Sequence, residues 1–542
     1  MRRNRWLILW ALLTSLVLIA AGCQRQAPEK PAGKGGLFRV ELSEPGSIDP
    51  PHADDSEEII LVHNLFEGLV VYDDETAKVK PGVATEWKAN EDATRFTFTL
   101  HPDAKFSNGE PVTAESFVRG WTRGTARDED GEVAYHLAGI KGYKEHHDDG
   151  TAAKLSGVLA RDENILEVTL TEPDADFVTK TGHSSFMPIP SDETIKAQKP
   201  SWGEFPIGNG PFMLKGPEPW KHNQSITMVP NPNYVGSRPK PTLDEVRFVI
   251  FADQQTAYTE FQAGNLDWTR IPPEKVKEAE EQNPGNFIKQ ATAGLDFLDL
   301  LITRAPTDNK KFRQAISLAV DRKLINDAIF NGLRQPADSI IPPLMPGYKK
   351  GACKLCRHDP AMAKKLFQES GVEVRGKLPL QFNAGGSHEQ WMQAVGDQIK
   401  TNLGIDYEFV TKGPPLSEYL EYLRGDAAPG GVSRLGWGMD YPTPQNFLFP
   451  LLHSAANDNY SKYKNPEFEA LLAKAGAETD TAKRLQIYQQ AEALALEDMP
   501  IIPMWFRVQF RLVRFDKFGG LRMDPNENPT MTTTFLKSAR EG

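Results

Sequence analysis

The amino-acid sequence predicts a mixed α/β fold divided into several lobes. The chain has 542 residues, more than one hydrophobic core normally organises, so it has room for two or three domains. Four short segments are strand-like, because they alternate apolar and polar side chains or are rich in β-branched residues: 37–42, 94–100, 165–170 and 246–251. Segments with helical periodicity interleave with these strands, and this order is typical of an α/β chain.

The helical pattern is plainest in the second half of the chain. Residues 312–330 carry apolar side chains at helical spacing, and we expect one helix there, ended by Asn331 and Gly332, which readily adopt a left-handed backbone. Residues 466–474 and 482–496 show the same spacing and predict a helical pair. Hydrophobic residues make up 39% and charged residues 25% of the chain, which are ordinary values for a folded protein.

The first 22 residues have the pattern of a secretory signal. Residues 1–5 are basic, residues 6–21 are almost entirely apolar, and small residues precede Cys23. The apolar run of about sixteen residues is shorter than the roughly 20 needed to cross a bilayer, which disfavours a permanent transmembrane helix. The end of this run resembles a bacterial lipoprotein box, with Ala20 where Leu is more common. Cys23 is therefore the expected lipidation site, and a plain signal peptide is the alternative.

Residues 23–36 follow as an expected lipidated tether. They are rich in Pro, Gly and Lys and lack apolar periodicity, which favours an extended linker. The sequence thus predicts a protein held at the extracytoplasmic face of the cell membrane. The formal net charge is −11, without a basic stripe of the kind that binds phosphate backbones, so nucleic acid is not an expected partner.

Motifs for catalysis and cofactor binding are absent. The chain contains no G-x-S-x-G, no P-loop and no H-E-x-x-H, since His388 and Glu389 lack the second histidine. Residues 146–149, His-His-Asp-Asp, could ligate a metal, but their polar neighbours favour a solvated turn. We expect no metal, no cofactor and no catalytic residue.

Cys353 and Cys356 are the two cysteines that remain after Cys23. Their spacing suits a disulfide, a redox dithiol or half of a zinc site. A structural zinc site needs four ligands, and no second cysteine pair exists. Because an exported protein folds under oxidising conditions, a local disulfide is favoured over a metal site, a catalytic dithiol or two free thiols.

The segment 434–442, Arg-Leu-Gly-Trp-Gly-Met-Asp-Tyr-Pro, is the most informative part of the body. Asp440 is the single carboxylate among Trp437, Tyr441 and residues with little bulk, where it would be partly desolvated and would need a cation. Judged from these residues alone, an internal salt bridge or a turn cap is favoured over a ligand contact.

The chain resembles the extracellular solute-binding protein family 5, whose best-known members are the oligopeptide- and dipeptide-binding receptors of ABC importers. The resemblance extends over essentially the whole mature chain and rests on the order of many short motifs rather than on any one of them. These motifs occupy residues 47–50, 64–69, 81–87, 96–101, 106–109, 111–114, 208–212, 309–323 and 436–441.

The resemblance implies a two-lobed, hinged α/β fold of the class II periplasmic-binding-protein type, with a small extra domain on the first lobe. Carried onto this chain, lobe one comprises residues 37–66, 205–298 and 510–542. The extra domain comprises residues 67–204, and lobe two comprises residues 299–509. The expected protein is a monomer.

The resemblance also implies a site. In peptide-binding members the aspartate matching Asp440 pairs with the α-ammonium group of the ligand. The peptide lies as an added strand between two backbone segments, here around Arg434, Gly436, Trp437 and Gly438 on one side and Asp54, Asp55 and Ser56 on the other. Main-chain hydrogen bonds and a terminal charge are common to all peptides, so such a site does not need to read side chains. Tyr135 and His388 match positions near the ligand pocket.

Three functions follow from these observations. The first is a membrane-tethered receptor that binds oligopeptides and delivers them to an ABC permease. The second keeps the fold but changes the ligand to a metal complex, haem, oligosaccharide or opine. The third is a secreted peptidase or a thiol oxidoreductase that uses Cys353 and Cys356, which no nucleophile–base pair in the sequence supports.

Overall fold

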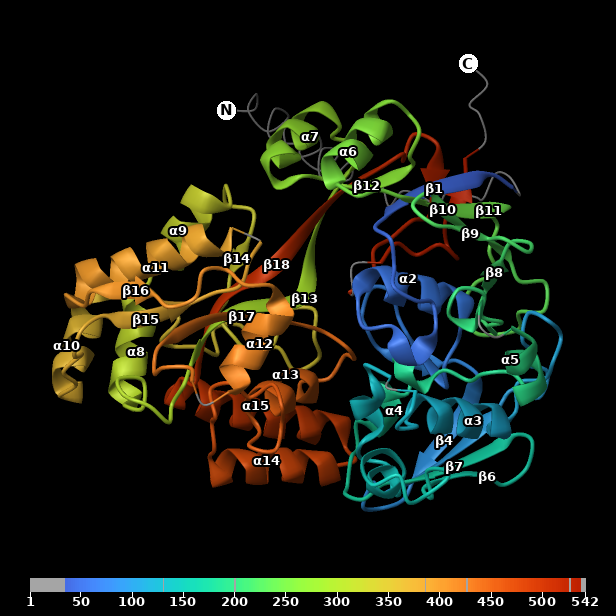
Figure 1. Cartoon of the computed structure of the whole chain (residues 1–542), viewed down its shortest axis with the longest axis horizontal. Helices are drawn as coiled ribbons and strands as arrows, with labels where there is room; N and C mark the ends of the chain where they lie inside the picture. Colours follow the sequence, from blue (N-terminus) through green and yellow to red (C-terminus); the bar gives the residue numbers. More distant parts are fainter. Residues whose placement is uncertain are drawn as a thin grey trace, which may run out of the picture.

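The computed structural model shows two lobes side by side, joined by two long antiparallel strands (Figure 1). It describes residues 35–129, 131–198, 201–385, 387–425, 427–525 and 528–537. The predicted signal segment and Cys23 lie outside these residues. Strands β13 (Phe287–Leu300) and β18 (Ile501–Val513) pair from Phe287↔Leu512 to Asp299↔Ile501 and belong to both lobes.

A twelve-stranded mixed sheet runs through both lobes. Its main path follows the order β16-β15-β17-β13-β18-β12-β1-β11-β10-β8, with β14 and β9 paired at its side. On the side of lobe one the strands are β1 (Leu37–Leu42), β8 (Phe212–Leu214), β9 (Trp220–Lys221), β10 (Ser225–Pro230), β11 (Glu245–Ile250) and β12 (Trp268–Arg270). On the side of lobe two they are β14 (Gln335–Pro336), β15 (Leu378–Gln381), β16 (Tyr407–Phe409) and β17 (Val432–Gly438).

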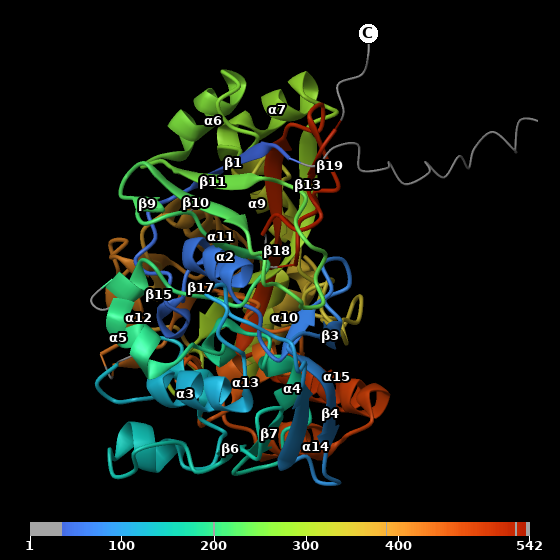
Figure 2. The same cartoon turned by 90° about the vertical axis from the view of Figure 1, so that its right-hand side faces the viewer.

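A second, four-stranded antiparallel sheet lies below lobe one (Figure 2). Its strands are β4 (Ala84–Ala89), β5 (Arg95–Leu100), β7 (Ile165–Thr169) and β6 (Val158–Ala160), in that order. Every second side chain of β5 points to one face of this sheet, and these are Phe96, Phe98 and Leu100. Helix α3 (Ala114–Gly124) covers that face with Phe117 and Trp121. This alternation is the reason why the segment forms a half-buried strand.

Buried apolar side chains gather in separate clusters. One lies within residues 69–186 and a second within residues 293–506. A third combines residues from 38–66, 187–268 and 513–531. We call these parts the extra domain, lobe two and lobe one. Each holds its own hydrophobic core, which is the mark of a separate structural body.

Helices pack on lobe two and supply most of its core. They are α8 (Lys310–Ala319), α9 (Arg322–Ile329), α10 (Pro360–Ser370), α11 (His388–Leu403), α12 (Leu416–Arg424), α13 (Gln445–Leu452), α14 (Pro466–Ala477) and α15 (Thr481–Asp498). The helical pair expected at 466–474 and 482–496 is confirmed as α14 and α15. None of the helices in the described part of the chain has both the length and the apolar character needed to span a bilayer.

The single helix expected at 312–330 is wrong, because the structure has two. Helix α8 ends at Val320, whose backbone is extended (φ −97°, ψ 117°). The Asp321 carboxylate then accepts a hydrogen bond from the Leu324 N–H (2.9 Å) and begins α9. The predicted left-handed stop is present, with φ 53° at Asn331 and 75° at Gly332.

The solvated turn expected at 146–149 is also wrong in part. Residues Lys144–Asp148 form a π-helical turn, and His146 is buried. Its ring nitrogens lie 2.8 Å and 2.9 Å from the carbonyl oxygens of Ala152 and Thr122. The imidazole therefore ties this turn to α3 instead of facing water.

Candidate ligand-binding site

The candidate site lies along β17, where one edge of the strand is open. From Val432 to Gly438, β17 pairs with β13, but its pairing with β15 stops at Ser433. From Arg434 onward, no further strand of the described chain borders the second edge. Such an edge offers backbone N–H and C=O groups to an extended ligand.

The two glycines of this edge have different surroundings. A Cβ atom at Gly436 would lie 2.4 Å from Arg507 Nη2 and 2.8 Å from Asp296 Oδ1, so a larger residue would have to displace these charged groups. A Cβ atom at Gly438 would meet no described atom within 4 Å. The strand is thus packed tightly at Gly436 and borders open space at Gly438. Trp437 between them is partly buried, and its indole N–H has no hydrogen-bond partner among the described residues.

Asp440 follows the open edge two residues after Gly438 and is partly buried. Its backbone N–H donates to Asn446 Oδ1 (2.9 Å), and Asn446 Nδ2 donates to its carboxylate (2.8 Å). No ion pair to Asp440 occurs within the described ranges. Of the two roles favoured by the residues alone, a salt bridge or a turn cap, the salt bridge is therefore wrong. Burial raises the pKa of Asp440 to about 6, Asn446 opposes this rise, and the negative charge of Asp458 adds to it.

Aromatic rings of the extra domain surround Asp440. Tyr135 and His136 belong to the short helix η2 (Ala134–Leu137), and their rings lie 4.1 Å apart. The ring of His136 lies 4.2 Å from that of His183 and 5.8 Å from that of Tyr441. Site residues from the extra domain therefore meet the end of β17 from lobe two.

Tyr135 lies between both predicted sides of the site. Desolvation of its hydroxyl raises the pKa of Tyr135, and the carboxylates of Asp440 and, more weakly, Asp54 act in the same direction. Yet 51% of its surface is exposed, so the ring borders the open space instead of filling a core. A ring in this position can contact a ligand.

The predicted second edge around Asp54 differs from an extended strand. Helix α2 (Ser56–Leu65) begins at Ser56, so Ser56 is helical. The Asp55 carboxylate caps this helix by accepting from the Glu58 N–H (2.9 Å), and the Asp54 N–H donates to Glu58 Oε2 (3.1 Å). The capping interaction explains the local fold, and only the residues before Ser56 can offer an extended backbone.

Positive charge gathers at the beginning of the open edge. Arg434 donates to Asp296 Oδ1 and to Asn383 Oδ1, each at 3.1 Å. Arg334 and Arg507 also form ion pairs with Asp296. Burial raises the pKa of Asp296, but Arg507, Arg334 and Arg434 together lower it to about 2. Three guanidinium groups around one carboxylate leave a positive excess.

His388 completes this end of the site. Its Nδ1 lies 3.1 Å from the carbonyl oxygen of Asn383, the residue whose side chain binds Arg434. Burial and the charge of Arg434 lower the pKa of His388 to about 4, so the ring is neutral near pH 7. The structure therefore brings together two sequence-predicted residues, Arg434 and His388, that are 46 positions apart in the numbering.

Several residues at the site had no sequence signal. His136, His183, Asp296, Arg334 and Arg507 come from separate segments and match no local motif. Only the fold shows that they surround β17 and Asp440. A single histidine in a sequence is more often structural than functional, so nothing in the chain's pattern would have selected these residues.

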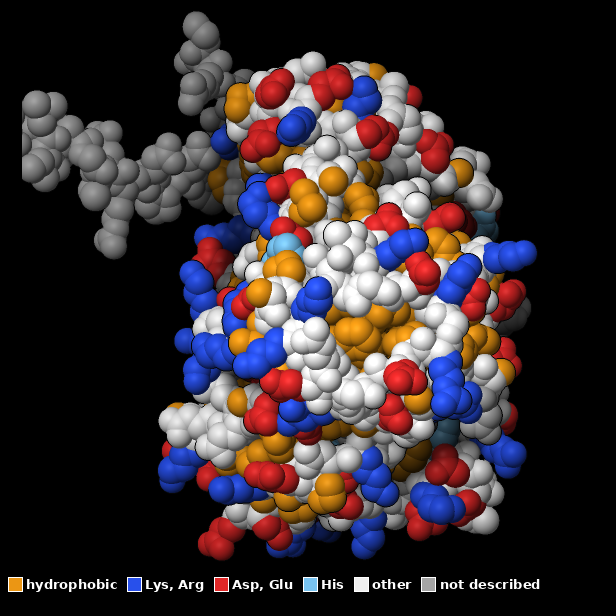
Figure 3. Space-filling view, turned by 90° about the vertical axis from the view of Figure 1, so that its left-hand side faces the viewer, with side chains coloured by type: hydrophobic (Ala, Val, Ile, Leu, Met, Phe, Trp, Pro, Cys, Tyr) orange, Lys and Arg blue, Asp and Glu red, His pale blue; other side chains and the backbone are white. Residues whose placement is uncertain are grey.

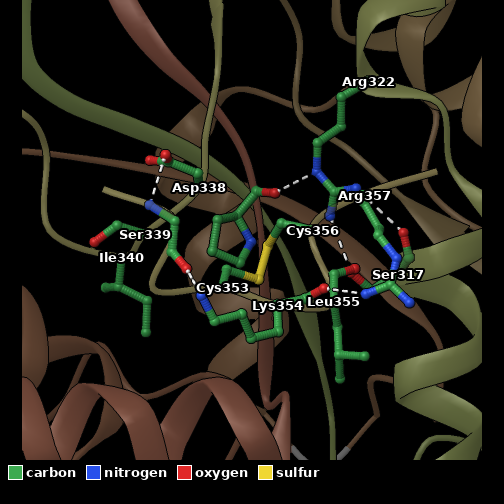
Figure 4. Close-up of a disulfide and its surroundings, with 12 residues drawn as sticks. Ser317, Arg322, Asp338, Ser339, Ile340, Cys353, Lys354, Leu355, Cys356 and Arg357 are labelled. Carbon is green, nitrogen blue, oxygen red and sulfur yellow. Dashed lines mark hydrogen bonds between the residues drawn. A yellow bond between two sulfur atoms is a disulfide. The ribbon is translucent and has the colours of Figure 1, made fainter. Parts of the chain in front are cut away.

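Cys353 and Cys356 form a disulfide (Figure 4). The Leu355 carbonyl within this small loop accepts from Ser317 Oγ of α8 (2.8 Å), and the Cys353 N–H donates to the Asp338 carbonyl (2.8 Å). Cys353 belongs to the core cluster of lobe two. These contacts give the disulfide a local structural role in fixing the loop against α8.

Comparison with known proteins agrees with this architecture. The family model of the bacterial extracellular solute-binding proteins, family 5, matches residues 78–459. The oligopeptide-binding protein OppA of Bacillus subtilis is 28% identical, with 93% of this chain and 94% of that protein covered. The probable deoxycholate-binding periplasmic protein YgiS of Escherichia coli is 30% identical, with 97% of each covered.

A solved structure confirms the predicted fold class. The unliganded open form of the periplasmic murein tripeptide-binding protein MppA has a TM-score of 0.78 to this chain at 28% identity, covering 93% of this chain and 99% of its own. The relatives are solute-binding proteins and not enzymes. Because the family model spans well over half of the chain, this protein belongs to the bacterial extracellular solute-binding proteins of family 5.

Proposed function

We propose that this protein is a receptor that binds oligopeptides by their free amino terminus and delivers them to an ABC permease. The observation that carries the proposal is Asp440, a desolvated carboxylate without an ion-pair partner in the described part of the chain. A buried carboxylate needs a cation. The α-ammonium group of a peptide supplies that cation, and every unmodified peptide carries one.

The open edge of β17 supports an extended peptide as the ligand. The stretch without a neighbouring strand leads from Arg434 to Gly438, about 13 Å at 3.3 Å per residue. The Arg434 carbonyl at its beginning already accepts from the Tyr419 hydroxyl (3.1 Å), so the peptide would bind to the groups beyond it. A peptide that adds to this edge gains main-chain hydrogen bonds that do not depend on its side chains. The open space beside Gly438 lies two residues from Asp440, where the amino terminus would be bound.

The positive cluster suits the opposite end of the ligand. Arg434, Arg334 and Arg507 outnumber the one carboxylate that they share. A peptide carboxylate near Arg434 would reduce the local excess of positive charge and could form a charge-assisted pair. One negative and one positive region at the two ends of a strand edge thus match the two charged termini of a peptide.

A second candidate ligand is an anionic solute without an amine. The relative from Escherichia coli is named for deoxycholate, and such an acid could bind the arginine cluster. It would leave Asp440 without a cation, however, and would add a second negative group to the cleft. The peptide is therefore the better match to the charges of the site.

The proposal is tested by incubating the purified protein with a mixture of short peptides and analysing the complex by native mass spectrometry. We expect intact peptides with free amino termini, bound one to each monomer. The same mixture after N-acetylation should give little complex. Peptides returned cleaved would indicate an enzyme, and retention of a bile acid in place of any peptide would support the second candidate.

We further propose that the receptor is tethered to the membrane through a lipid on Cys23. This rests on the basic, apolar and small-residue order ahead of that cysteine. Expressed in a bacterial host, Cys23→Ala should move the protein from the membrane fraction to the soluble fraction without changing peptide affinity. If the variant stays in the membrane fraction, the tether has another cause.

The outer face of lobe two carries charges of both signs. On the outer face of lobe two, Lys and Arg intermingle with Asp and Glu (Figure 3). This mixture does not form the continuous positive track that a phosphate backbone requires.

A further inference from the structure

Three metal-binding side chains meet where the extra domain faces lobe two. His136 comes from η2, and His183 immediately precedes the short helix η4 (Ser184–Phe186). Asp440 follows β17 of lobe two. One potential ligand atom from each residue lies within 4.8 Å of the other two. Two imidazoles and a carboxylate thus converge from segments far apart in the sequence.

The two histidines are arranged so that each can ligate a metal. His136 Nε2 is buried and has no hydrogen-bond partner among the described residues. Leaving a buried polar atom unpaired costs free energy, so such an atom calls for a partner. His183 Nδ1 lies 2.9 Å from Ser185 Oγ. The same Nδ1 accepts a hydrogen bond from the Ser185 backbone N–H (3.3 Å). For its Nε2 to bind a metal, the ring must take the tautomer with its proton on Nδ1, which then donates to the Ser185 hydroxyl instead.

The charges around the three residues favour a cation. Both imidazoles are held neutral by burial, which lowers the pKa of each, and Asp440 adds one negative charge when ionised. The positive charge of Lys180 also lowers the pKa of His136, but this lysine is paired with Asp174 (2.6 Å), and its ammonium lies 5.4 Å from the centre of the Tyr441 ring. Neutral imidazole nitrogens and a carboxylate oxygen are the ligands that Zn²⁺ and neighbouring transition metals prefer.

We propose that His136, His183 and Asp440 form a binding site for a divalent transition-metal ion, with Zn²⁺ as the representative ion. Three protein ligands leave a fourth position of the metal open. Zn–N and Zn–O bonds of about 2.0–2.2 Å place the ligands of a tetrahedral ion roughly 3.4 Å apart. Because His136 and His183 belong to the extra domain and Asp440 to lobe two, the bound metal would link these two bodies.

The site has a consequence for the ligand. A protonated amino terminus and a metal ion both need Asp440, and the two cations repel each other. Zn²⁺ and a free-amine peptide should therefore compete. This regulation extends the proposed function, but metal binding itself needs no peptide and can be tested without one.

The test is a calorimetric titration of Zn²⁺ into the mature protein after dialysis against a chelator, without peptide. We expect one ion per chain. His136→Gln and His183→Gln should each weaken binding at least tenfold, the size of effect seen when residues supporting a metal site are changed. Co²⁺ in place of Zn²⁺ should give the visible absorption of a site with nitrogen and oxygen ligands, and this absorption should be lost in both variants.

The matched control is His52→Gln. His52 belongs to a second group with Asp49 and Glu129 whose ligand atoms also lie within 4.8 Å of one another. There, however, Asp49 is already bound by two nitrogens of Arg123 (2.9 Å and 2.6 Å). The control variant should bind Zn²⁺ as the wild type does.

Two outcomes would overturn the metal site. One is unchanged Zn²⁺ binding in both His136→Gln and His183→Gln with their thermal unfolding intact, and the other is loss of binding in His52→Gln alone. If peptides bind and Zn²⁺ does not, the metal site fails and the proposed function stands. If Zn²⁺ binds as expected and no peptide does, the metal site stands and the proposed function fails.

Discussion

Asp440→Asn is expected to weaken the binding of a free-amine peptide by roughly 10² to 10³-fold. The substitution keeps the size of the side chain but removes its charge, which leaves the ligand's ammonium group desolvated without a counter-ion. Removing one member of such a pair costs about 3 to 5 kcal/mol when the pair is fully buried, and the partial exposure of Asp440 places the expected effect at the lower end. Each factor of ten in affinity corresponds to about 1.4 kcal/mol. Calorimetry in a buffer with a metal chelator measures the change.

A matched series identifies the interaction. N-acetylation of the peptide removes the same charge from the other side and should weaken wild-type binding to a similar degree. The two changes together should cost much less than their sum, since one interaction cannot be lost twice. The control is Asp458→Asn, which changes a nearby carboxylate that is already paired with Arg424 and should alter affinity only a few-fold. Equal wild-type affinity for free and acetylated peptides would show that Asp440 does not anchor the amino terminus.

Much of the local fold could be predicted, because apolar periodicity is a local property of the sequence. The segment expected at 37–42 is strand β1 with the same ends, and those expected at 94–100 and 246–251 differ from β5 and β11 by one residue at their ends. The helix at 312–330 was predicted as one because apolar residues keep helical spacing across its centre. Asp321 is a helix-capping residue type, and it was the signal that a second helix begins there.

The site was less predictable than the fold. Asp440 could be selected because it lies in a short segment of unusual composition that resembles a family motif. The side chains around it come from segments between positions 135 and 507, and no local pattern connects them. His146 illustrates the same limit. Its neighbours in the sequence are polar, but its imidazole is buried and lies 2.9 Å from the backbone carbonyl of Thr122, 24 positions away.

Arg484→Met is expected to destabilise the protein by about 3 to 5 kcal/mol, because it leaves a buried carboxylate without its counter-ion. Arg484 Nε donates to Asp176 (2.9 Å), the residue that precedes helix α4 (Phe177–Lys180), and the Tyr488 hydroxyl donates to the same carboxylate (2.7 Å). Both Asp176 and Arg484 are buried. Burial already raises the pKa of Asp176, and Arg484 opposes that rise. Chemical denaturation followed by tryptophan fluorescence measures the loss.

This ion pair joins two bodies, since Asp176 belongs to the extra domain and Arg484 to α15 of lobe two. The Ala175 N–H donates to the Gly476 carbonyl beside it (2.7 Å), so backbone contacts reinforce the same junction.

Replacing both partners by apolar residues, Asp176→Leu with Arg484→Met, should cost less than the sum of the single changes, because no lone charge is left buried. Arg161→Met provides the control. It breaks an ion pair with Glu167 at the surface and should change stability far less than Arg484→Met, because solvent screens exposed pairs. If Arg484→Met has no larger effect than Arg161→Met, the junction is held by packing and backbone contacts, and the lobes do not depend on this charge pair.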